Sequence, residues 1–257
     1  MPSVFEPELA FANEVADRAA EIAMSFFLGS FRTHQKADDS PVTEADLAVE
    51  AAFREMVAHR FPNDAVIGEE QGSDAPAERE WVIDPIDGTK NFADGVPVWA
   101  TLLALHVEGR GVVGVAGAPA LHERFSATDG GGAFRNGTRI HVSDRPLDRA
   151  FFLYSSVDDW IFGERRGAFE GLLRDTRRNR GFGDFWGHML VARGVADIMV
   201  EPDLRIWDWA APAVIIREAG GRMTTFEGHE LADGCSALTT NGSVHDDVVK
   251  RLSGGDT

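Results

Sequence analysis

A run of strand-like segments joined by turn chemistry occupies the middle of the chain, and it constrains the fold more than any other feature. The segments read AVIGEE, WVIDP, VWATLLALHVEG, GVVGVAGAP, ERFSAT and RIHVS. Gly-rich turns and the hairpin signal RNGT separate several of them. Because strands joined by short turns pair antiparallel, residues 65–143 predict a largely antiparallel sheet.

Two amphipathic helices are predicted before this run. Residues 7–29 carry apolar side chains at helical spacing and end at Gly29, a typical helix stop. The second helix has Thr43 as its expected N-cap, and Asp46 three residues later completes a capping box. These helices predict a helical layer beside the sheet.

The pattern changes after about residue 147, where predicted strands and helices alternate. We therefore expect an α+β lobe over residues 1–147 and an α/β lobe over residues 148–257. No long linker separates them, so the lobes are expected to pack directly, with the ligand site in the cleft between them.

Composition restricts the classes of function. The chain has 257 residues, 44% of them hydrophobic, and its 42 acidic and 25 basic residues give a net charge of −17. This charge opposes binding to nucleic acid or to an anionic membrane surface. No run of about 18 apolar residues and no signal-peptide pattern occur, so we expect a soluble, cytoplasmic protein. Cys235 is the lone cysteine and is expected in the core.

The segment WVIDPIDGTKNF, residues 81–92, is the most informative motif. Asp84 and Asp87 flank a corner at which Pro85 is expected to end a buried strand, and the corner could aim the carbonyl of Ile86 at a metal ion. A plain turn at Asp87, with Asp84 as a helix cap, is the alternative interpretation.

A helix is predicted to begin directly after this corner. The backbone N–H groups of Gly88 and Thr89 would then lie at a helix N-terminus and could bind an anion. Phosphate and two aspartates repel each other unless divalent cations lie between them. The motif therefore indicates a site for metal and phosphate together.

A site for several cations needs carboxylates from further elements. Glu69 and Glu70 end a predicted strand, Asp46 lies in the first turn of a helix, and Asp208 lies at the start of another. Each has a simpler interpretation, respectively as solvated loop acids, a capping-box partner and an N-cap. All of these acids falling at element ends favours the metal site.

The motifs GEE, WVIDPIDGTKNF and WDWAAPAVIIREAGG, with PVTEAD upstream, resemble those of the inositol monophosphatase-like family of Mg²⁺-dependent, lithium-sensitive phosphatases. The similarity covers nearly the whole chain. It implies a two-lobed, five-layered αβαβα sandwich, usually a homodimer, that acts on a small phosphorylated metabolite.

The resemblance also implies two to three Mg²⁺ ions for each active site. It assigns one ion to Glu69, Asp84 and the carbonyl of Ile86, and a second ion to Asp84, Asp87 and Asp208. The first ion would lower the pKa of the attacking water, and the second would neutralise charge on the leaving oxygen.

The remaining roles follow from the same resemblance. Glu69, with Asp46 acting through water, would hold a third and weaker ion. Thr89 and Glu69 would orient and deprotonate the water, while the amides of Gly88 and Thr89 hold the phosphate. The residues expected around the substrate are Glu69, Ile86, Asp87, Gly88, Thr89, Arg180, Asp184, Glu201 and Asp208.

The segment RNRGFGDFWGHMLVARG looks most like the branch of the family that hydrolyses L-histidinol phosphate. A carboxylate at Asp184 suits that substrate because it can pair with an ammonium group or a protonated imidazole. Arg180 and Glu201 match substrate-contacting positions. The alternatives are a basic surface run for Arg180, a helix N-cap for Asp184 and a strand-end surface acid for Glu201; His188 is expected to be structural.

Other members of the family remain possible interpretations. Lys90 completes a DGTK sequence that also occurs in phosphatases of 3′-phosphoadenosine 5′-phosphate, and a broad inositol-1-monophosphatase is the runner-up. A catalytically inactive binding module with the same fold is the alternative outside enzymes.

Overall fold

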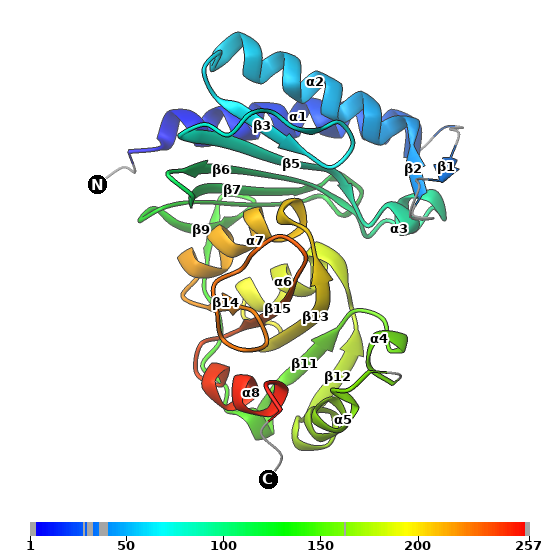
Figure 1. Cartoon of the computed structure of the whole chain (residues 1–257), viewed down its shortest axis with the longest axis vertical. Coiled ribbons are helices and arrows are strands. Elements are labelled where there is room, and N and C mark those ends of the chain that lie inside the picture. The colour runs from blue at the N-terminus through cyan, green and yellow to red at the C-terminus, as the bar shows by residue number, and fades with distance from the viewer. Residues whose placement is uncertain (1–3, 28, 30–32, 36–40, 162, 255–257) are drawn as a thin grey trace.

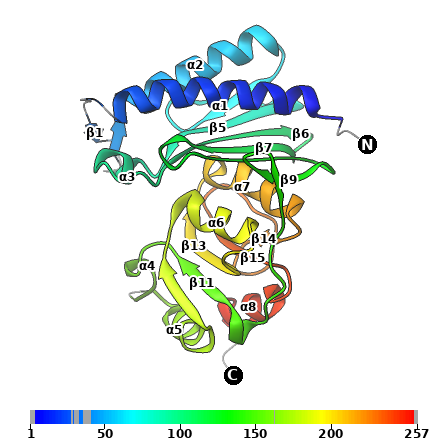
Figure 2. The same cartoon turned by 180° about the vertical axis from the view of Figure 1, so that it is seen from behind.

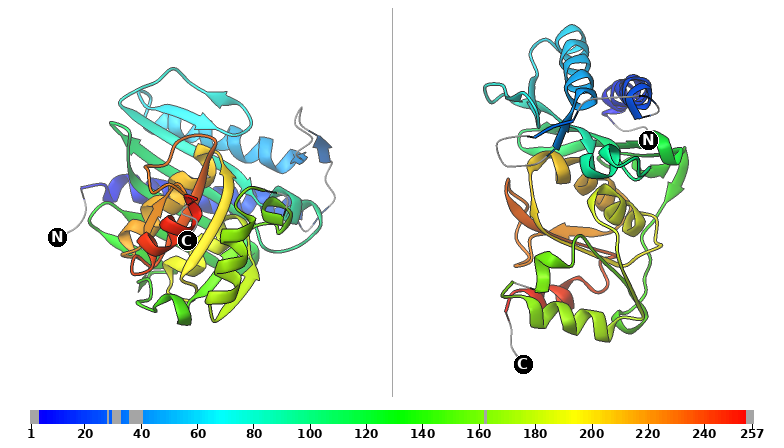
Figure 3. Two further views of the ribbon diagram at one scale, coloured as in Figure 1. Left: turned by 60° about the horizontal axis from the view of Figure 1, so that its bottom comes forward. Right: turned by 90° about the vertical axis from the view of Figure 1, so that its right-hand side faces the viewer.

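The computed structural model describes residues 4–27, 29, 33–35, 41–161 and 163–254. Its elements stack in five layers, helix on sheet on helix on sheet on helix (Figure 1). The right-hand view of Figure 3 shows the stack edge-on. The αβαβα sandwich implied by the family resemblance is confirmed.

The larger sheet has the strand order β10-β9-β8-β7-β6-β5-β3-β4. All its neighbours pair antiparallel except β3 and β5, which are parallel. This confirms the predicted, largely antiparallel sheet. Its strands are β3 (Ala65–Gly68), β4 (Gly72–Ser73), β5 (Arg79–Asp87), β6 (Ala100–Val107), β7 (Arg110–Ala118), β8 (Glu123–Thr128), β9 (Gly132–Arg135) and β10 (Thr138–Ile140).

Helices α1 (Glu6–Phe27) and α2 (Glu44–Arg60) cover the outer face of this sheet (Figure 2). Their apolar stripes pack with Trp81, Ile83 and Leu103 of the sheet in one buried cluster. The predicted capping box of Thr43 and Asp46 is present at the start of α2. Strands β1 (Thr33–Gln35) and β2 (Pro41–Thr43) form a short antiparallel ribbon beside it.

The smaller sheet has the order β12-β11-β13-β15-β14, with β11 parallel to both its neighbours and β15 antiparallel to both of its own. Its strands are β11 (Phe151–Tyr154), β12 (Arg178–Gly181), β13 (Ile198–Leu204), β14 (Arg222–Thr224) and β15 (Cys235–Thr240). Around it lie α4 (Asp158–Ile161), α5 (Arg166–Asp175) and α8 (His245–Leu252). Two 3₁₀ turns are also present: Pro119–Leu121 lies between β7 and β8, and Leu147–Arg149 lies between β10 and β11. Cys235 is only half-buried, so its expected place in the core is wrong.

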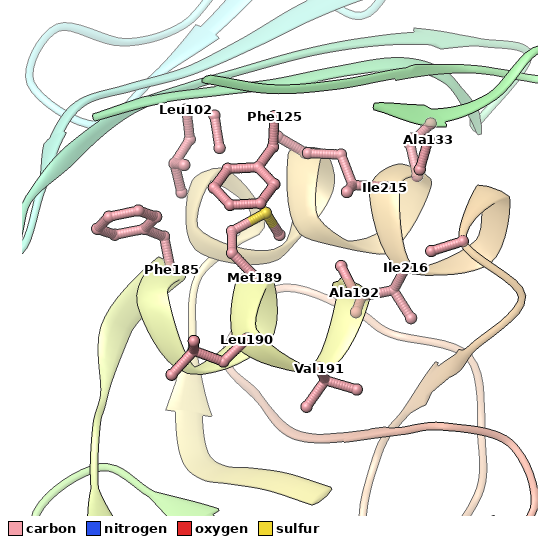
Figure 4. Close-up of a cluster of buried hydrophobic side chains, with 14 of the residues drawn as sticks. Leu102, Phe125, Ala133, Phe185, Met189, Leu190, Val191, Ala192, Ile215 and Ile216 are labelled. Atoms are coloured by element: carbon pink, nitrogen blue, oxygen red, sulfur yellow. The ribbon is translucent and has the colours of Figure 1, made fainter. Parts of the chain in front are cut away.

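Helices α6 (Asp184–Ala192) and α7 (Ile206–Glu218) form the central layer and lie between the two sheets. In Figure 4, Phe185 and Met189 of α6 lie beside Leu102 and Phe125 of the larger sheet and Ile215 of α7. The same cluster includes residues of the smaller sheet, among them Leu153 and Met199. One apolar core therefore joins both sheets. The division at residue 147 falls between β10 and β11 and stays a prediction.

Strand β5 departs from the sequence prediction in a way that matters for the site. It continues through Pro85 to Asp87, where the sequence predicts that proline ends the strand. The pairing register with β6 shifts between Asp84 and Asp87, and a bulge of this kind tolerates a residue without an N–H group. The Thr101 hydroxyl donates to the Pro85 carbonyl over 2.8 Å, which holds the bulge.

Candidate functional site

A cavity of about 530 Å³ lies where β5 and α3 (Thr89–Ala93) of the larger-sheet half meet α6, β13 and α7. Both halves of the chain contribute to its wall, as the predicted cleft requires. Its lining residues are Glu69, Asp84, Ile86, Asp87, Gly88, Thr89, Lys90, Asn91, Asp184, Phe185, His188, Glu201, Asp203, Leu204 and Asp208.

Asp84, Asp87 and Asp208 offer carboxylate oxygens that all lie within 4.8 Å of one another. The β5 bulge brings the first two together, and Asp208 is the third residue of α7. Asp208 is not the N-cap that the simpler interpretation assumed: Arg205 is, and its N–H donates to Asp208 over 2.6 Å. The structure thus gathers three carboxylates that are far apart in the sequence.

Burial and mutual repulsion raise the pKa values of all three carboxylates. Burial, followed by the charge of Glu69, raises the pKa of Asp84 well above its ordinary value. Burial and then the charge of Asp184 do the same to the pKa of Asp87. For Asp208, burial is again the largest cause and raises the pKa to about 8. A hard divalent cation among these oxygens would remove the repulsion.

Asp46 and Glu69 lie near this group. Asp46 is buried in the first turn of α2, and one of its oxygens accepts the Thr43 N–H over 2.8 Å. Its other oxygen, Oδ1, has no hydrogen-bond partner among the described residues. The same is true of Oδ1 of Asp84. Burial raises the pKa of Asp46 to about 6, with the Glu69 charge adding to it. Such orphaned buried oxygens suit a cation, so Asp46 can be both a cap and a ligand.

The corner after β5 opens helix α3. Gly88 is its N-cap with φ of 83°, where a Cβ would lie 3.1 Å from the Val98 carbonyl. The Thr89 hydroxyl donates to the Ile86 carbonyl over 3.0 Å, and that carbonyl keeps a second lone pair for a cation. The helix predicted to begin at the cavity wall is therefore present.

Another part of the cavity wall carries a second acidic pair, Asp184 and Glu201, and Asp184 lies close to Asp87. Asp184 begins α6 with φ of 55°, and its N–H donates to Glu201 Oε1 over 3.3 Å. Burial, and then the charge of Glu201, raises the pKa of Asp184 to about 6. The N-cap of α6 is Gly183, and Glu201 is buried inside β13. The cap and surface-acid interpretations of these residues are both wrong.

His188 forms a hydrogen bond with the Glu201 carboxylate, a role that the sequence did not indicate. Its ring is buried, with Nε2 3.2 Å from Glu201 Oε2 and Nδ1 2.8 Å from the Thr239 hydroxyl. An ionised carboxylate only accepts, so Nε2 carries the hydrogen of this bond. The available signal was its position four residues after Asp184, on the same face of a helix.

The structure links the two walls directly. The N–H of Phe185 donates to Asp87 Oδ2 over 2.8 Å, and Asn91 Nδ2 donates to Asp184 Oδ2 over 3.3 Å. Neither Phe185 nor Asn91 was singled out as a site residue from the sequence. These two bonds connect the elements that carry Asp87 to the start of α6, where Asp184 lies.

Two predicted site residues, Asp46 and Arg180, are not among those that line the cavity, and of these Arg180 lies away from the clustered carboxylates. It lies exposed on β12, where its guanidinium donates to the carbonyl of the adjacent Asn179. Lys90 does line the cavity, and its charge lowers the pKa of Asp184 slightly against the larger raising causes. Within the described part of the chain, the basic side chain at the cavity is therefore a lysine on α3.

Comparisons with known proteins agree with this geometry. A profile of the inositol monophosphatase family matches residues 5–252. The histidinol-phosphatase of Mycobacterium tuberculosis is 44% identical over 96% of this chain and 98% of that protein, and that of Streptomyces coelicolor is 41% identical over 98% and 99%.

The solved structure of an inositol monophosphatase from Zymomonas mobilis superimposes with a TM-score of 0.87 at 31% identity. The alignment covers 98% of this chain and 100% of that one. Family motifs, fold and nearly full-length similarity thus coincide, and the chain belongs to the inositol monophosphatase family.

Proposed function

We propose that this protein is a Mg²⁺-dependent phosphomonoesterase that hydrolyses L-histidinol phosphate to L-histidinol and phosphate. The observation that carries the proposal is a single cavity with two acidic walls. One wall has the crowded carboxylates that suit cations, and the other has the acidic pair that suits a positively charged alcohol. The relatives named histidinol-phosphatase support the same substrate.

The residues that would hold Mg²⁺ are Glu69, Asp84, Asp87 and Asp208, with Asp46 for a weaker additional ion. When bound, two to three such ions would supply a water of lowered pKa and neutralise charge on the ester oxygens. Hard cations prefer these oxygen ligands, and Mg²⁺ commonly keeps several waters in sites of this kind.

The chain's own groups then position the substrate. The N-terminus of α3, with the Gly88 and Thr89 amides, faces the phosphate. Glu69 and Thr89 orient the attacking water, and the Glu69 carboxylate takes up its proton. In the same cavity, Asp184 and Glu201 pair with the ammonium or imidazolium group of the alcohol. Inositol offers no such cation, so it would gain less from this wall.

A panel of esters tests the proposal. Purified protein is offered histidinol phosphate, inositol 1-phosphate and 3′-phosphoadenosine 5′-phosphate, each with Mg²⁺ and after chelation. We expect the highest kcat/KM for histidinol phosphate, loss of activity on chelation and recovery when Mg²⁺ is restored. The Asp84→Asn variant, which lacks a shared ligand, should lose at least about 10³-fold in kcat.

Two outcomes would contradict the proposal. A higher kcat/KM for inositol 1-phosphate would identify a broad inositol monophosphatase. A protein that hydrolyses none of the three esters in the presence of Mg²⁺ would be a binding module. A homodimer, expected from the family resemblance, is proposed in addition and is measured by light scattering of the same sample.

A further inference from the structure

Glu50 is a fully buried carboxylate that lies outside the cavity. It sits on α2 with 0% of its surface exposed, four residues after Asp46 and so on the same face of the helix. Burial of a charged group is costly unless hydrogen bonds satisfy it. The hydrogen bonds to Glu50 therefore have to offset the cost of burying its charge.

Among the described residues, three donors reach the Glu50 carboxylate. Its Oε2 accepts the N–H of Glu70 over 2.8 Å, and its Oε1 accepts the N–H of Gln71 over 3.1 Å. Arg54 Nε donates to Oε1 over 2.9 Å and balances the charge. The two backbone donors belong to the turn between β3 and β4, directly after Glu69.

Gly68 makes this contact possible. A Cβ built on Gly68 would lie 2.2 Å from Glu50 Oε1, so the carboxylate fills the space that any other residue would occupy. The φ of Gly68 is not in the left-handed region, so the backbone conformation alone does not require glycine. Close approach of the Glu50 carboxylate is the physical reason for glycine here.

Arg54 ties the far side of the same hairpin. Its guanidinium donates to the Gly72 carbonyl and, over 3.3 Å, to Asp74 Oδ1. Asp74 in turn accepts the N–H of Val66 over 2.9 Å. Glu50 and Arg54 of α2 therefore form hydrogen bonds with the β3–β4 hairpin on both sides of its turn.

We propose that Glu50 is a positioning residue that holds the β3–β4 turn so that Glu69 is directed at the cations of the active site. The inference rests on the proposed metal-dependent function. Glu69 lies close enough to Asp84 and Asp46 for its charge to repel theirs. A carboxylate in that position moves away unless its backbone is held, and the Glu50 bonds hold it before any cation arrives.

The variant Glu50→Gln tests this role. An amide keeps the size of the side chain but can accept at one oxygen only and turns an NH₂ group toward backbone N–H donors. We expect Mg²⁺ affinity, measured by calorimetry, to fall about 10-fold or more, which is the usual effect of losing a group that orients a ligand.

Two further variants make the result specific. Gly68→Ala displaces the Glu50 carboxylate without changing it and should reproduce the loss of Mg²⁺ affinity. Glu55→Gln, an exposed acid on the same helix, should leave affinity unchanged. Hydrogen exchange of the Glu70 and Gln71 amides, followed without metal, should accelerate in the first two variants and not in the third.

If Glu50→Gln lowers Tm equally with and without Mg²⁺ and leaves Mg²⁺ affinity intact, Glu50 is a structural residue and the proposal is overturned. Wild-type protein that binds Mg²⁺ but does not hydrolyse histidinol phosphate contradicts the proposed substrate alone. Wild-type protein that does not bind Mg²⁺ overturns both proposals.

Discussion

At the scale of single residues, Asp184 is the side chain that should separate substrates. Its carboxylate lines the cavity beside Glu201, close enough to Asp87 for its charge to raise the pKa of Asp87, and it accepts a hydrogen bond from Asn91. A charge placed there contributes to binding only when the substrate carries an opposite charge. Small phosphate esters without a cation gain nothing from it.

The variant Asp184→Asn should therefore lower kcat/KM for histidinol phosphate about 10- to 100-fold, the value of a hydrogen bond to a charged group. Hydrolysis of p-nitrophenyl phosphate should change by less than about 3-fold. Steady-state kinetics of both esters measures this, with Asp94→Asn, an exposed acid outside the cavity, as the control. An equal loss on both esters would show that Asp184 instead supports the carboxylates that are proposed to bind Mg²⁺.

The residues that the sequence revealed and those that it hid differ in a physical way. Asp84 and Asp87 lie in the last part of β5 and Asp208 lies in the first turn of α7, so local pattern places them near element ends, where sites form. His188 lies within a helix and acts through a strand residue, Glu201, and a second strand residue, Thr239. That contact depends on how α6 packs across the smaller sheet, which no local pattern encodes.

At the scale of elements, two strands show where local rules fail. Proline normally ends a ladder because it lacks an N–H, but β5 places Pro85 in a bulge where that donor is not needed. Strand β12 has the sequence RNRG, which suggests a basic surface run. Pairing with β11 creates the strand in spite of its low intrinsic preference.

Helix α8 offers a test of pH dependence. Its first residue, His245, is buried between two threonines, with Nδ1 2.9 Å from Thr240 Oγ1 and Nε2 3.0 Å from Thr224 Oγ1. Burial, followed by the nearby Arg222, lowers the pKa of His245 to about 4. The folded protein thus keeps this ring neutral where the unfolded chain, with a pKa of about 6.5, takes up a proton.

The unfolded state binds more protons in this window, so the His245 contribution to the free energy of unfolding falls as pH drops from about 6.5 to about 4. Replacement by Asn should make the stability less sensitive to acid over that range. Urea unfolding of both proteins at several pH values measures the difference between them. Parallel curves for wild type and His245→Asn would contradict the assignment.

At the scale of the whole molecule, the crowded carboxylates make stability depend on metal and pH together. The raised pKa of Asp46, about 6, and of Asp208, about 8, means that the folded protein without metal binds more protons than the unfolded chain. Its free energy of unfolding should therefore fall as pH rises from about 4 to about 8.

Bound Mg²⁺ requires these carboxylates to be ionised, so it displaces the protons and binds more tightly at higher pH. We expect the rise in Tm caused by Mg²⁺ to be small near pH 5.5 and several degrees larger near pH 8, by about 4 °C or more. Thermal unfolding with and without Mg²⁺ across this range measures it. A rise in Tm that is independent of pH would contradict the proton displacement.

The overall architecture was only partly predictable. Element types and their order follow from periodicity and turn residues, and the layered sandwich follows from the family resemblance. The single core between the sheets does not, because α6 and α7 bury several faces at once. Residues such as Ala211 and Ile215 look like one stripe of a surface helix until both sheets are in place.

The order of strands in the smaller sheet has a consequence for biosynthesis. Strand β15 (Cys235–Thr240) lies between β13 and β14, although it follows both along the chain. A nascent polypeptide therefore cannot complete this sheet, or seat the β13 residue Glu201 beside the cavity, until residue 240 has left the ribosome. Premature termination anywhere before that point yields a product without a finished active site, so every such fragment is expected to be inactive.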